Sequence, residues 1–183
     1  MIFVIIFKLI KSKFKTKSMI KSKNQIIFLF LTAILMISFE SCNPTKKYEK
    51  EENEKIQDYI IKNSNLNFVL KPSGLYYLDV LEGSGPSPVT HDTAYVLYTG
   101  KLLDGTLFER NVGTPDTLIF PVGEGVLNVA GFDEGITYMR EGGKAMFLIP
   151  SNLGFGNTGY YLPAYTPVLY DVELVKIVAG PGK

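Results

Sequence analysis

Residues 131–150 read GFDEGITYMREGGKAMFLIP, a stretch that predicts a short helix followed directly by a buried strand. Phe132, Ile136 and Met139 recur at helical spacing, so the helix has one apolar stripe. Its first turn is acidic and Arg140 lies in its last turn, which is the charge order that the helix dipole favours. The two glycines that follow end the helix. The rest of the chain is therefore expected to cover the apolar stripe.

Strand-like segments surround this unit. The apolar run 144–149 has the length of a strand, and Pro150 ends it because proline cannot continue a central ladder. Further strands, separated by turn residues, are expected at 75–81, 93–98, 106–108, 118–122 and 168–178. A loop rich in Gly, Pro and Tyr occupies 151–167. With one short helix among many strands, the expected fold class is α+β: a curved antiparallel β-sheet wrapped around that helix.

The composition limits the classes of protein to which the chain can belong. Its 183 residues, 46% of them hydrophobic, are enough for one domain with a core and a targeting segment. The formal net charge is +1, but lysines are concentrated before residue 24, so the folded remainder is acidic and no nucleic-acid surface is indicated. One Cys and one His leave no intrachain disulfide and no Cys/His metal cluster. We expect no metal and no cofactor.

The sequence offers few groups for covalent catalysis. His91 lies in an expected turn, and no serine has the setting of a nucleophile, so a catalytic triad is not indicated. Aromatic side chains, in contrast, are frequent near the loops, where they fill a core or line an apolar cleft. They are Tyr98, Phe108, Phe120, Phe132, Phe155, Tyr160, Tyr161 and Tyr170.

The N-terminal part has the layout of a secretory signal. Lysines precede the apolar run 26–38, which is short for a membrane span, and Ser41 and Cys42 follow it. A small residue before a Cys resembles the end of a bacterial lipoprotein signal, in which the Cys is lipidated and becomes the new N-terminus. The resemblance implies a lipid anchor on Cys42. An ordinary signal peptide that ends near a free Cys, and an uncleaved anchor, remain as alternatives.

Composition divides the chain into four expected parts. They are a targeting segment at 1–41 that starts at Met1 or Met19, a flexible tether at 42–53, an N-terminal helix with its linker at 54–73, and a globular domain at 74–183. Ile56, Tyr59 and Ile60 recur at helical spacing and predict an amphipathic helix from about Glu51 to Lys62. We expect this helix to pack on the domain; pairing with a second copy is the alternative.

A series of short motifs carries a family resemblance. In chain order they are Tyr98-Thr99-Gly100, Asp104-Gly105, Phe108-Glu109, residues 120–123, Gly131 to Gly135, Ile149-Pro150, Gly154-Phe155-Gly156 and Tyr170 to Leu174. From about Leu97 to Ile177 their order and spacing resemble the FKBP-type peptidyl-prolyl cis-trans isomerases. The N-terminal part resembles the lipoprotein members of that family in bacterial envelopes, especially Bacteroidetes-like ones.

The resemblance implies the half-barrel fold of this family, with a pocket between helix and sheet that binds a proline ring. It implies Phe132 as the pocket floor and, as catalytic residues, Tyr98, Glu109, Phe132 and Phe155. It implies as substrate-binding residues Phe108, Leu118, Val129, Leu162 and Tyr170. Of these, Val129 presents its backbone N–H to the ligand carbonyl, and Leu162 lies in the loop that overhangs the pocket.

Two positions depart from the family pattern. Glu109 stands where Asp is common, and by the resemblance its carboxylate lies near the Tyr98 hydroxyl at the pocket edge. Phe155 stands where Tyr is common, so a hydroxyl that donates to the bound ligand is lost. A missing hydrogen bond of this kind is worth about 0.5 to 1.5 kcal/mol. We therefore expect severalfold weaker binding at this position.

The activity implied by the resemblance is isomerisation of X-Pro bonds in exported proteins. Proline-containing segments are the expected substrates, and a macrolide of the FK506 type is a candidate ligand. The barrier, roughly 18 to 20 kcal/mol, arises from the double-bond character of the amide, so no nucleophile or metal is needed. The alternative is a non-catalytic chaperone or assembly factor that uses the same pocket. The expected location is the cell envelope, through a lipid anchor in the outer membrane on its periplasmic or outer side.

Overall fold

The computed structural model describes residues 44–159 and 161–181. Its elements in chain order are α3 (Pro44–Lys62), β1 (Val69–Leu70), β2 (Tyr76–Leu81), β3 (Thr93–Leu102), β4 (Leu107–Arg110), β5 (Leu118–Pro121), α4 (Ala130–Thr137), β6 (Lys144–Ile149), the 3₁₀ helix η1 (Ser151–Leu153) and β7 (Val168–Val178). In this part of the chain, no helix combines the length and the apolar character that crossing a membrane requires. The predicted targeting segment, including Cys42, lies outside the described residues.

The strands form one antiparallel sheet in the order β1-β2-β6-β7-β3-β4, and β5 also pairs with β3. The two long central strands β3 and β7 pair from Thr93↔Val178 to Leu102↔Val168. Register shifts interrupt three of the pairings, β2 with β6, β3 with β4, and β3 with β7. Such irregularities increase the local twist and bend the strands. The expected curved antiparallel sheet is therefore present, together with the α+β fold class.

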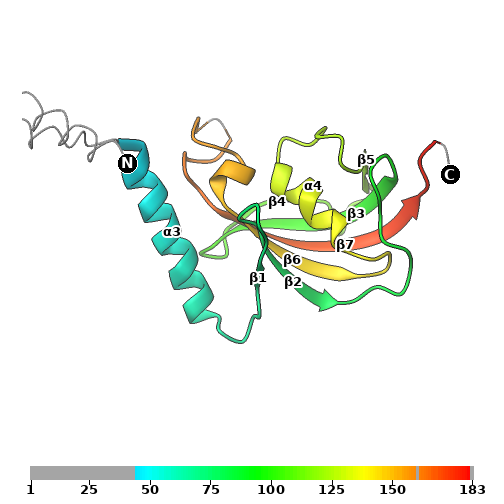
Figure 1. Cartoon of the computed structure of the whole chain (residues 1–183), viewed down its shortest axis with the longest axis horizontal. Coiled ribbons are helices and arrows are strands. Elements are labelled where there is room, and N and C mark those ends of the chain that lie inside the picture. Colours follow the sequence, from blue (N-terminus) through cyan, green and yellow to red (C-terminus); the bar gives the residue numbers. More distant parts are fainter. Residues whose placement is uncertain (1–43, 160, 182–183) are drawn as a thin grey trace, which may run out of the picture. The chain divides into compact units, whose positions relative to one another are not determined.

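The short helix α4 lies against one face of this sheet, as Figure 1 shows. Its stripe of Phe132, Ile136 and Met139 is buried, as the sequence predicts. Gly135 permits the close approach, because a Cβ there would lie 2.6 Å from the ring of Phe147 on β6. Register partners on neighbouring strands point to the same face of a sheet. Phe147 and its register partner Tyr170 therefore both pack in the cluster around α4.

The end of α4 differs from the prediction. The helix ends at Thr137, so Arg140 lies in the following turn and not in the last helical turn. The Tyr138 N–H donates to the Gly135 carbonyl at 3.2 Å and the Met139 N–H to the Ile136 carbonyl at 3.1 Å. These i to i+3 bonds tighten the last turn and satisfy carbonyls that would otherwise need a longer helix. Met139 stays buried although it lies beyond the helix.

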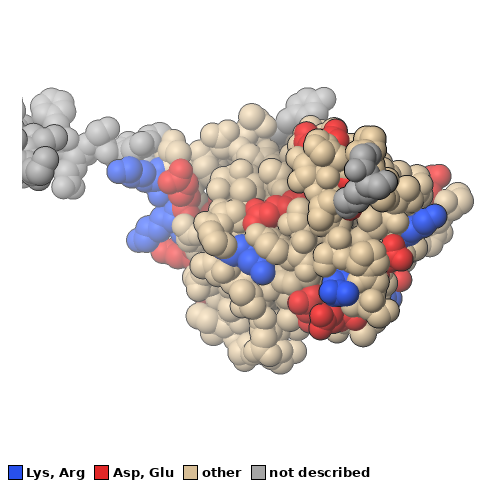
Figure 2. All heavy atoms as spheres, turned by 45° about the vertical axis from the view of Figure 1, so that its right-hand side comes forward, with Lys and Arg blue, Asp and Glu red and all other residues tan. Residues whose placement is uncertain are grey.

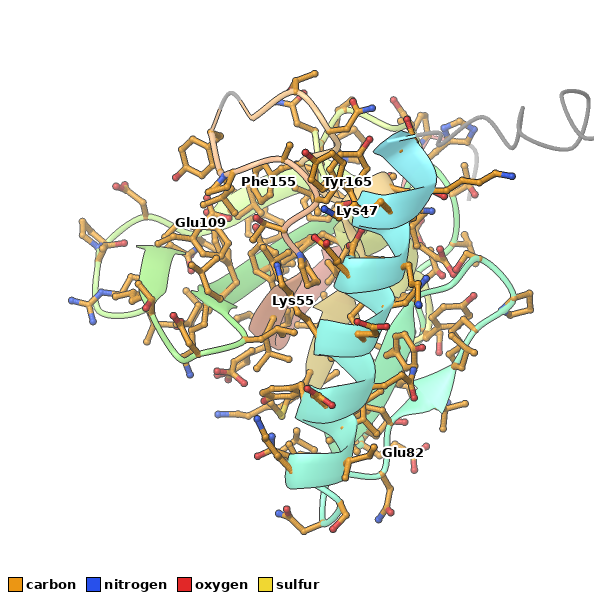
Figure 3. The ribbon with its side chains drawn as sticks, turned by 90° about the vertical axis from the view of Figure 1, so that its left-hand side faces the viewer. Lys47, Lys55, Glu82, Glu109, Phe155 and Tyr165 are labelled. Carbon is orange, nitrogen blue, oxygen red and sulfur yellow. The ribbon has the colours of Figure 1, made fainter. Side chains whose placement is uncertain are left out.

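The longer helix α3 packs on the opposite face of the sheet, and Figure 3 shows it crossing in front of the strands. Ile56 is fully buried against Leu148 and Leu169, the neighbours of the inward-facing Phe147 and Tyr170. The prediction that this helix packs on the domain is confirmed.

The predicted start of this helix and the predicted tether are wrong for residues 44–53, which are helical. Proline suits the first position of a helix, and α3 begins at Pro44. Exposed pairs, Lys47 with Glu51 and Lys50 with Glu54, lie at i, i+4 spacing with 3.7 Å between the charged atoms. A polar, charged run has the composition of a tether but equally that of the exposed side of a helix.

The remaining elements follow the strand predictions closely. The strands at 144–149 and 168–178 have the predicted bounds, and the others shift or extend at their ends. The long β3 continues to Leu102, beyond the predicted end at 98, and the two-residue strand β1 was not predicted.

On the face shown in Figure 2 the described surface is mostly uncharged, and acidic and basic side chains are scattered over it.

Candidate active site

Phe132 of α4 forms the base of an aromatic cluster on the inner face of the sheet. Its ring centroid lies 5.1 Å from that of Tyr170 and 5.6 Å from that of Tyr98, both in edge-to-face geometry. Phe147 and Phe120 complete its surroundings at 5.8 and 6.3 Å. Edge-to-face contacts at these distances are favourable beyond the area they bury. The ring of Phe132 is therefore held by strands from both halves of the sheet.

A second group of aromatic rings packs against this cluster. Phe108 on β4 contacts Tyr170 and Phe155 edge to face, in both cases with 5.8 Å between ring centroids. Phe155 lies in the loop after η1, and the ring of Tyr161 from the same loop lies 5.2 Å from it and 6.3 Å from Phe108. The sheet and the loop 151–167 thus meet around Phe108.

The structure brings together all the site residues that the sequence suggested within its described part. Val129, Phe132 and Tyr170 are buried members of one hydrophobic cluster. The half-buried residues packed against this cluster include Tyr98, Phe108, Leu118, Phe155 and Leu162. Glu109 joins them through a hydrogen bond with Tyr170. Val129 directly precedes α4, and its carbonyl accepts the N–H of Phe132 at 3.0 Å.

A cavity of about 430 Å³ opens beside the aromatic rings. Its lining is Glu109, Asn128, Gly154, Phe155, Thr158 and Tyr161. A volume of this size is in the range of ligand pockets, and its mixture of rings with a few polar groups is typical of them. Figure 3 shows Glu109 and Phe155 on neighbouring parts of the molecule, one from β4 and the other from the loop.

The single carboxylate in this lining is positioned by a tyrosine. The buried Tyr170 hydroxyl donates a hydrogen bond to Oε1 of Glu109. Burial first, and then this hydrogen bond and the nearby negative charge, raise the pKa of Tyr170 far above its ordinary value. The resemblance implies that the carboxylate lies near the Tyr98 hydroxyl, and its charge does act on Tyr98, while its hydrogen bond comes from Tyr170. Burial and then the charge of Glu109 also raise the pKa of Tyr98, so both hydroxyls stay protonated at neutral pH.

Gly100 on β3 explains why these groups can meet. It is the register partner of Glu109 on β4 and also of Tyr170 on β7, so it lies between them in the sheet. A Cβ at Gly100 would lie 2.8 Å from Phe108, 3.0 Å from Glu109 and 3.0 Å from Tyr170. Atoms at these distances would have to move. The absence of a side chain therefore lets the tyrosine and the carboxylate meet above the strand.

Asp133 fixes the turn that leads into α4. Its buried carboxylate accepts the N–H of Gly123 at 2.8 Å and that of Gly125 at 3.2 Å. Both glycines have positive φ, 75° and 64°, which favours glycine. Sequence reasoning assigned Asp133 only to the helix dipole. Its contact with the preceding turn had no sequence signal beyond the two glycines themselves.

Asn111 extends β4 beyond its last residue and was also missed. Its side-chain carbonyl accepts the N–H of Tyr98 at 2.7 Å, and its amide nitrogen donates to the Val96 carbonyl at 2.9 Å. Its own N–H donates to the Tyr98 carbonyl at 3.1 Å. The buried side-chain amide of Asn111 therefore makes hydrogen bonds to the β3 backbone where β4 has no further residue.

Three lining residues, Asn128, Thr158 and Tyr161, were not indicated by the resemblance, and Tyr161 is the aromatic one. The sequence signals it only through the excess of aromatic residues near loops. Within the described residues, no group of three or more His, Cys, Asp or Glu side chains is arranged to hold a metal ion. His91 lies on the surface, where its Nδ1 is 2.9 Å from the Glu124 carboxylate.

With the fold and the pocket established, comparison with known proteins identifies the class. The family of FKBP-type peptidyl-prolyl cis-trans isomerases matches residues 85–175. The chain is 36% identical over 106 residues to the FK506-binding protein of Neisseria meningitidis serogroup B, a match that covers 57% of this chain and 96% of that protein. The chain therefore belongs to the FKBP-type peptidyl-prolyl cis-trans isomerase family.

Longer relatives match as well. The chain is 33% identical over 133 residues to the probable FKBP-type peptidyl-prolyl cis-trans isomerase FkpA of the same organism, covering 71% of this chain and 48% of that protein. Its fold resembles the crystal structure of FkpA from Escherichia coli with a TM-score of 0.61 and 26% identity, over 96% of this chain and 82% of that chain. The chain spans about half the length of several curated relatives that it matches.

Proposed function

We propose that this protein accelerates the cis–trans isomerisation of X-Pro peptide bonds by binding them non-covalently in the aromatic pocket. The observation that carries the proposal is the arrangement around Phe132, whose buried ring packs against Tyr98 and Tyr170. Tyr170 in turn contacts Glu109, the one carboxylate in the cavity lining. Proline is compact and apolar, so its ring suits an aromatic base. The flanking peptide groups need polar partners at the rim.

The chemistry requires only a change of environment. The planar amide is charge-separated, and a dry apolar pocket disfavours it relative to the twisted amide on the reaction path. Interactions that are stronger with the twisted state lower the barrier. Tyr98 keeps its proton at neutral pH and can donate to a peptide carbonyl. Phe155 contributes ring surface but no hydroxyl.

The substrates in this proposal are proline-containing segments of exported proteins, and a macrolide of the FK506 type is a further ligand of the same pocket. Exchange spectroscopy on a short X-Pro peptide tests the proposal, because cis and trans signals exchange slowly without a catalyst. The full chain, at a small fraction of the peptide concentration, should speed this exchange. The variant Phe132→Ala should reduce it.

The same samples address the rival function, a chaperone that holds unfolded segments without catalysis. Suppression of aggregation of an unfolded client that persists in Phe132→Ala, together with no exchange by the wild-type chain, would overturn the isomerase proposal in favour of that rival. Circular dichroism of both proteins establishes that the comparison is between folded chains.

We further propose that the protein is a lipoprotein of the cell envelope, of the bacterial form seen in Bacteroidetes-like members, with its lipid on Cys42. Support comes from the sequence: lysines before the apolar run 26–38, and Ser41 directly before the Cys. Several acyl chains on one Cys would give a stable anchor, whereas one chain binds only weakly. Metabolic labelling with a tagged fatty acid should label the wild type and not Cys42→Ala. An unlabelled wild-type protein in the soluble fraction would contradict the proposal.

A further inference from the structure

Glu52 is a buried carboxylate on α3, 6% exposed, that contacts a residue 99 positions further along the chain. Its Oε1 accepts the backbone N–H of Ser151 at 2.5 Å, and its Oε2 accepts the Ser151 hydroxyl at 2.7 Å. Ser151 is itself only 4% exposed. Both oxygens of the carboxylate are therefore used on one residue, which lies at the start of η1.

Ser151 in turn determines the position of the pocket loop. Its carbonyl accepts the N–H of Gly154 at 3.0 Å and the N–H of Gly156 at 2.8 Å. These two glycines flank Phe155, whose ring packs on Phe108 and lines the cavity. The N–H and the hydroxyl of Ser151 thus donate to Glu52 on α3, while its carbonyl oxygen orders the turn that carries Phe155.

A second contact from α3 reaches the far end of the same loop. The ring of Tyr48 stacks on that of Tyr165, with centroids 5.2 Å apart and an interplanar angle of 17°. The Tyr165 N–H donates to the Gly156 carbonyl at 3.1 Å. Tyr165 has a φ of 57°, a conformation that a side-chain-bearing residue keeps only when its surroundings impose it. In Figure 3 the labelled Tyr165 lies beside the N-terminal half of α3, near Lys47.

The burial of the Glu52 carboxylate between α3 and η1 requires a physical explanation. Burying a charge is unfavourable unless it is compensated by hydrogen bonds, and an apolar side chain could dock a helix without that cost. Charge-assisted hydrogen bonds are shorter and stronger than neutral ones and constrain the geometry of the donor. Ile56 already supplies apolar contact one turn along the helix. What Glu52 adds is a directed contact to Ser151.

We propose that Glu52 is a positioning residue for the pocket: through Ser151 it holds Phe155 in place and so sets how well the pocket binds and turns over its ligand. The proposal rests on the proposed isomerase function for its effect on turnover. Its structural half, that Glu52 orders the turn 151–156, does not depend on any activity.

Hydrogen exchange of the full chain without ligand tests the structural half. The amides of Gly154 and Gly156 are compared with those of Phe147 and Tyr170 in the sheet. In Glu52→Ala the two loop amides should exchange at least about tenfold faster, because both hydrogen bonds from Ser151 to the carboxylate are lost, while the sheet amides change little. Glu52→Gln keeps an acceptor for the Ser151 N–H, and its amide can donate to the rotatable hydroxyl, so it should restore slow exchange.

The matched control is Glu51→Ala, which removes an exposed carboxylate from the same helix and should leave the loop amides unchanged. Unchanged loop exchange in Glu52→Ala would overturn the proposal. So would an equal increase in loop and sheet, since Glu52 would then only stabilise the fold. Should Glu52→Ala fail to fold, Ser151→Ala provides the same comparison with one hydrogen bond removed, and should give a smaller increase confined to the loop.

Peptide kinetics on the same proteins test the functional half. Glu52→Ala should raise KM and lower kcat/KM severalfold, with Glu52→Gln close to wild type. A faster loop exchange with unchanged kinetics would contradict the effect on turnover. An inactive wild-type chain would instead refute the proposed isomerase function, while the exchange comparison would still decide whether Glu52 orders the loop.

Discussion

Tyr170 on β7 and Glu109 on β4 form a hydrogen bond across the strand between them, above Gly100, which is the register partner of both. The carboxylate lies in the lining of the cavity, and the tyrosine ring packs against Phe132. One hydrogen bond therefore connects the aromatic cluster around Phe132 with the only carboxylate among the residues that line the cavity. The charge and the orientation of Glu109 can be tested separately from the fold.

The variant Glu109→Gln keeps the shape of the side chain and an acceptor for the Tyr170 hydroxyl but removes the charge. We expect the free energy of unfolding to change by less than about 1 kcal/mol, because the hydrogen bond persists in neutral form. Peptide kcat/KM or macrolide affinity should change severalfold. Urea unfolding and peptide kinetics measure both, with the exposed Glu54→Gln as control. If peptide kcat/KM and macrolide affinity both stay at their wild-type values, Glu109 is only a surface charge beside Phe108.

Tyr161 should contribute to binding without contributing much to stability. Tyr161 is 54% exposed, yet its ring packs on Phe155 and lines the cavity. Tyr161→Ala should raise the KM for an X-Pro peptide severalfold with little change in melting temperature. Tyr161→Phe separates the ring from the hydroxyl: wild-type KM would assign the effect to the ring. An unchanged KM in Tyr161→Ala would exclude this residue from the site.

Asp133→Asn should destabilise the fold more than an ordinary surface change. The asparagine offers one acceptor where the carboxylate serves the N–H groups of Gly123 and Gly125. Leaving a buried donor unsatisfied costs about 1 to 3 kcal/mol. Chemical denaturation measures the loss, and the exposed Asp58→Asn should stay within about 0.5 kcal/mol of wild type. Equal stability of both variants would show that the turn does not depend on Asp133.

The stability of the fold should fall at alkaline pH because of its buried and half-buried tyrosines. Burial is the main cause that raises the pKa of Tyr77, Tyr98 and Tyr170 in the folded protein. In the unfolded chain these hydroxyls ionise near pH 10, roughly the model value. Above that pH the unfolded chain binds fewer protons than the folded one, so the free energy of unfolding decreases as pH rises. At neutral pH both states are protonated and the effect is absent.

Urea unfolding between pH 8 and about pH 11 measures this slope. Tyr77→Phe removes one of the three groups, the one whose hydroxyl donates to Asp79 at 2.5 Å. Its stability should therefore decline less steeply than that of the wild type. A slope that is identical in the two proteins would mean that Tyr77 does not ionise differently in the folded and unfolded states.

Periodicity was sufficient to predict most of the sheet and the buried stripe of α4. Strands 144–149 and 168–178 have predicted bounds because their apolar runs end at proline or turn residues. The end of α4 was missed because its last turn is closed by i to i+3 bonds, which depend on backbone geometry and not on residue type. The charged run in the first half of α3 predicts a tether, because such a run has the same composition in a coil and on the exposed side of a helix.

The site residues could be named from the family resemblance, but the hydrogen bonds between them could not be predicted from the sequence. That Glu109 meets Tyr170 follows from a shared register partner, Gly100, and registers are tertiary information. The burial of Glu52 likewise depends on a partner 99 residues away. Charged residues are rarely buried, so the sequence alone favours exposure for Glu52.

The most direct test of the central claim is the rate of cis–trans isomerisation of an X-Pro peptide with the purified full chain and with Phe132→Ala. The account predicts that the wild type increases the rate in proportion to its concentration, and that kcat/KM falls at least about tenfold in a Phe132→Ala protein that remains folded, because the base of the pocket is lost. A folded wild-type chain that leaves the uncatalysed rate unchanged, or equal rates from the two proteins, would contradict it.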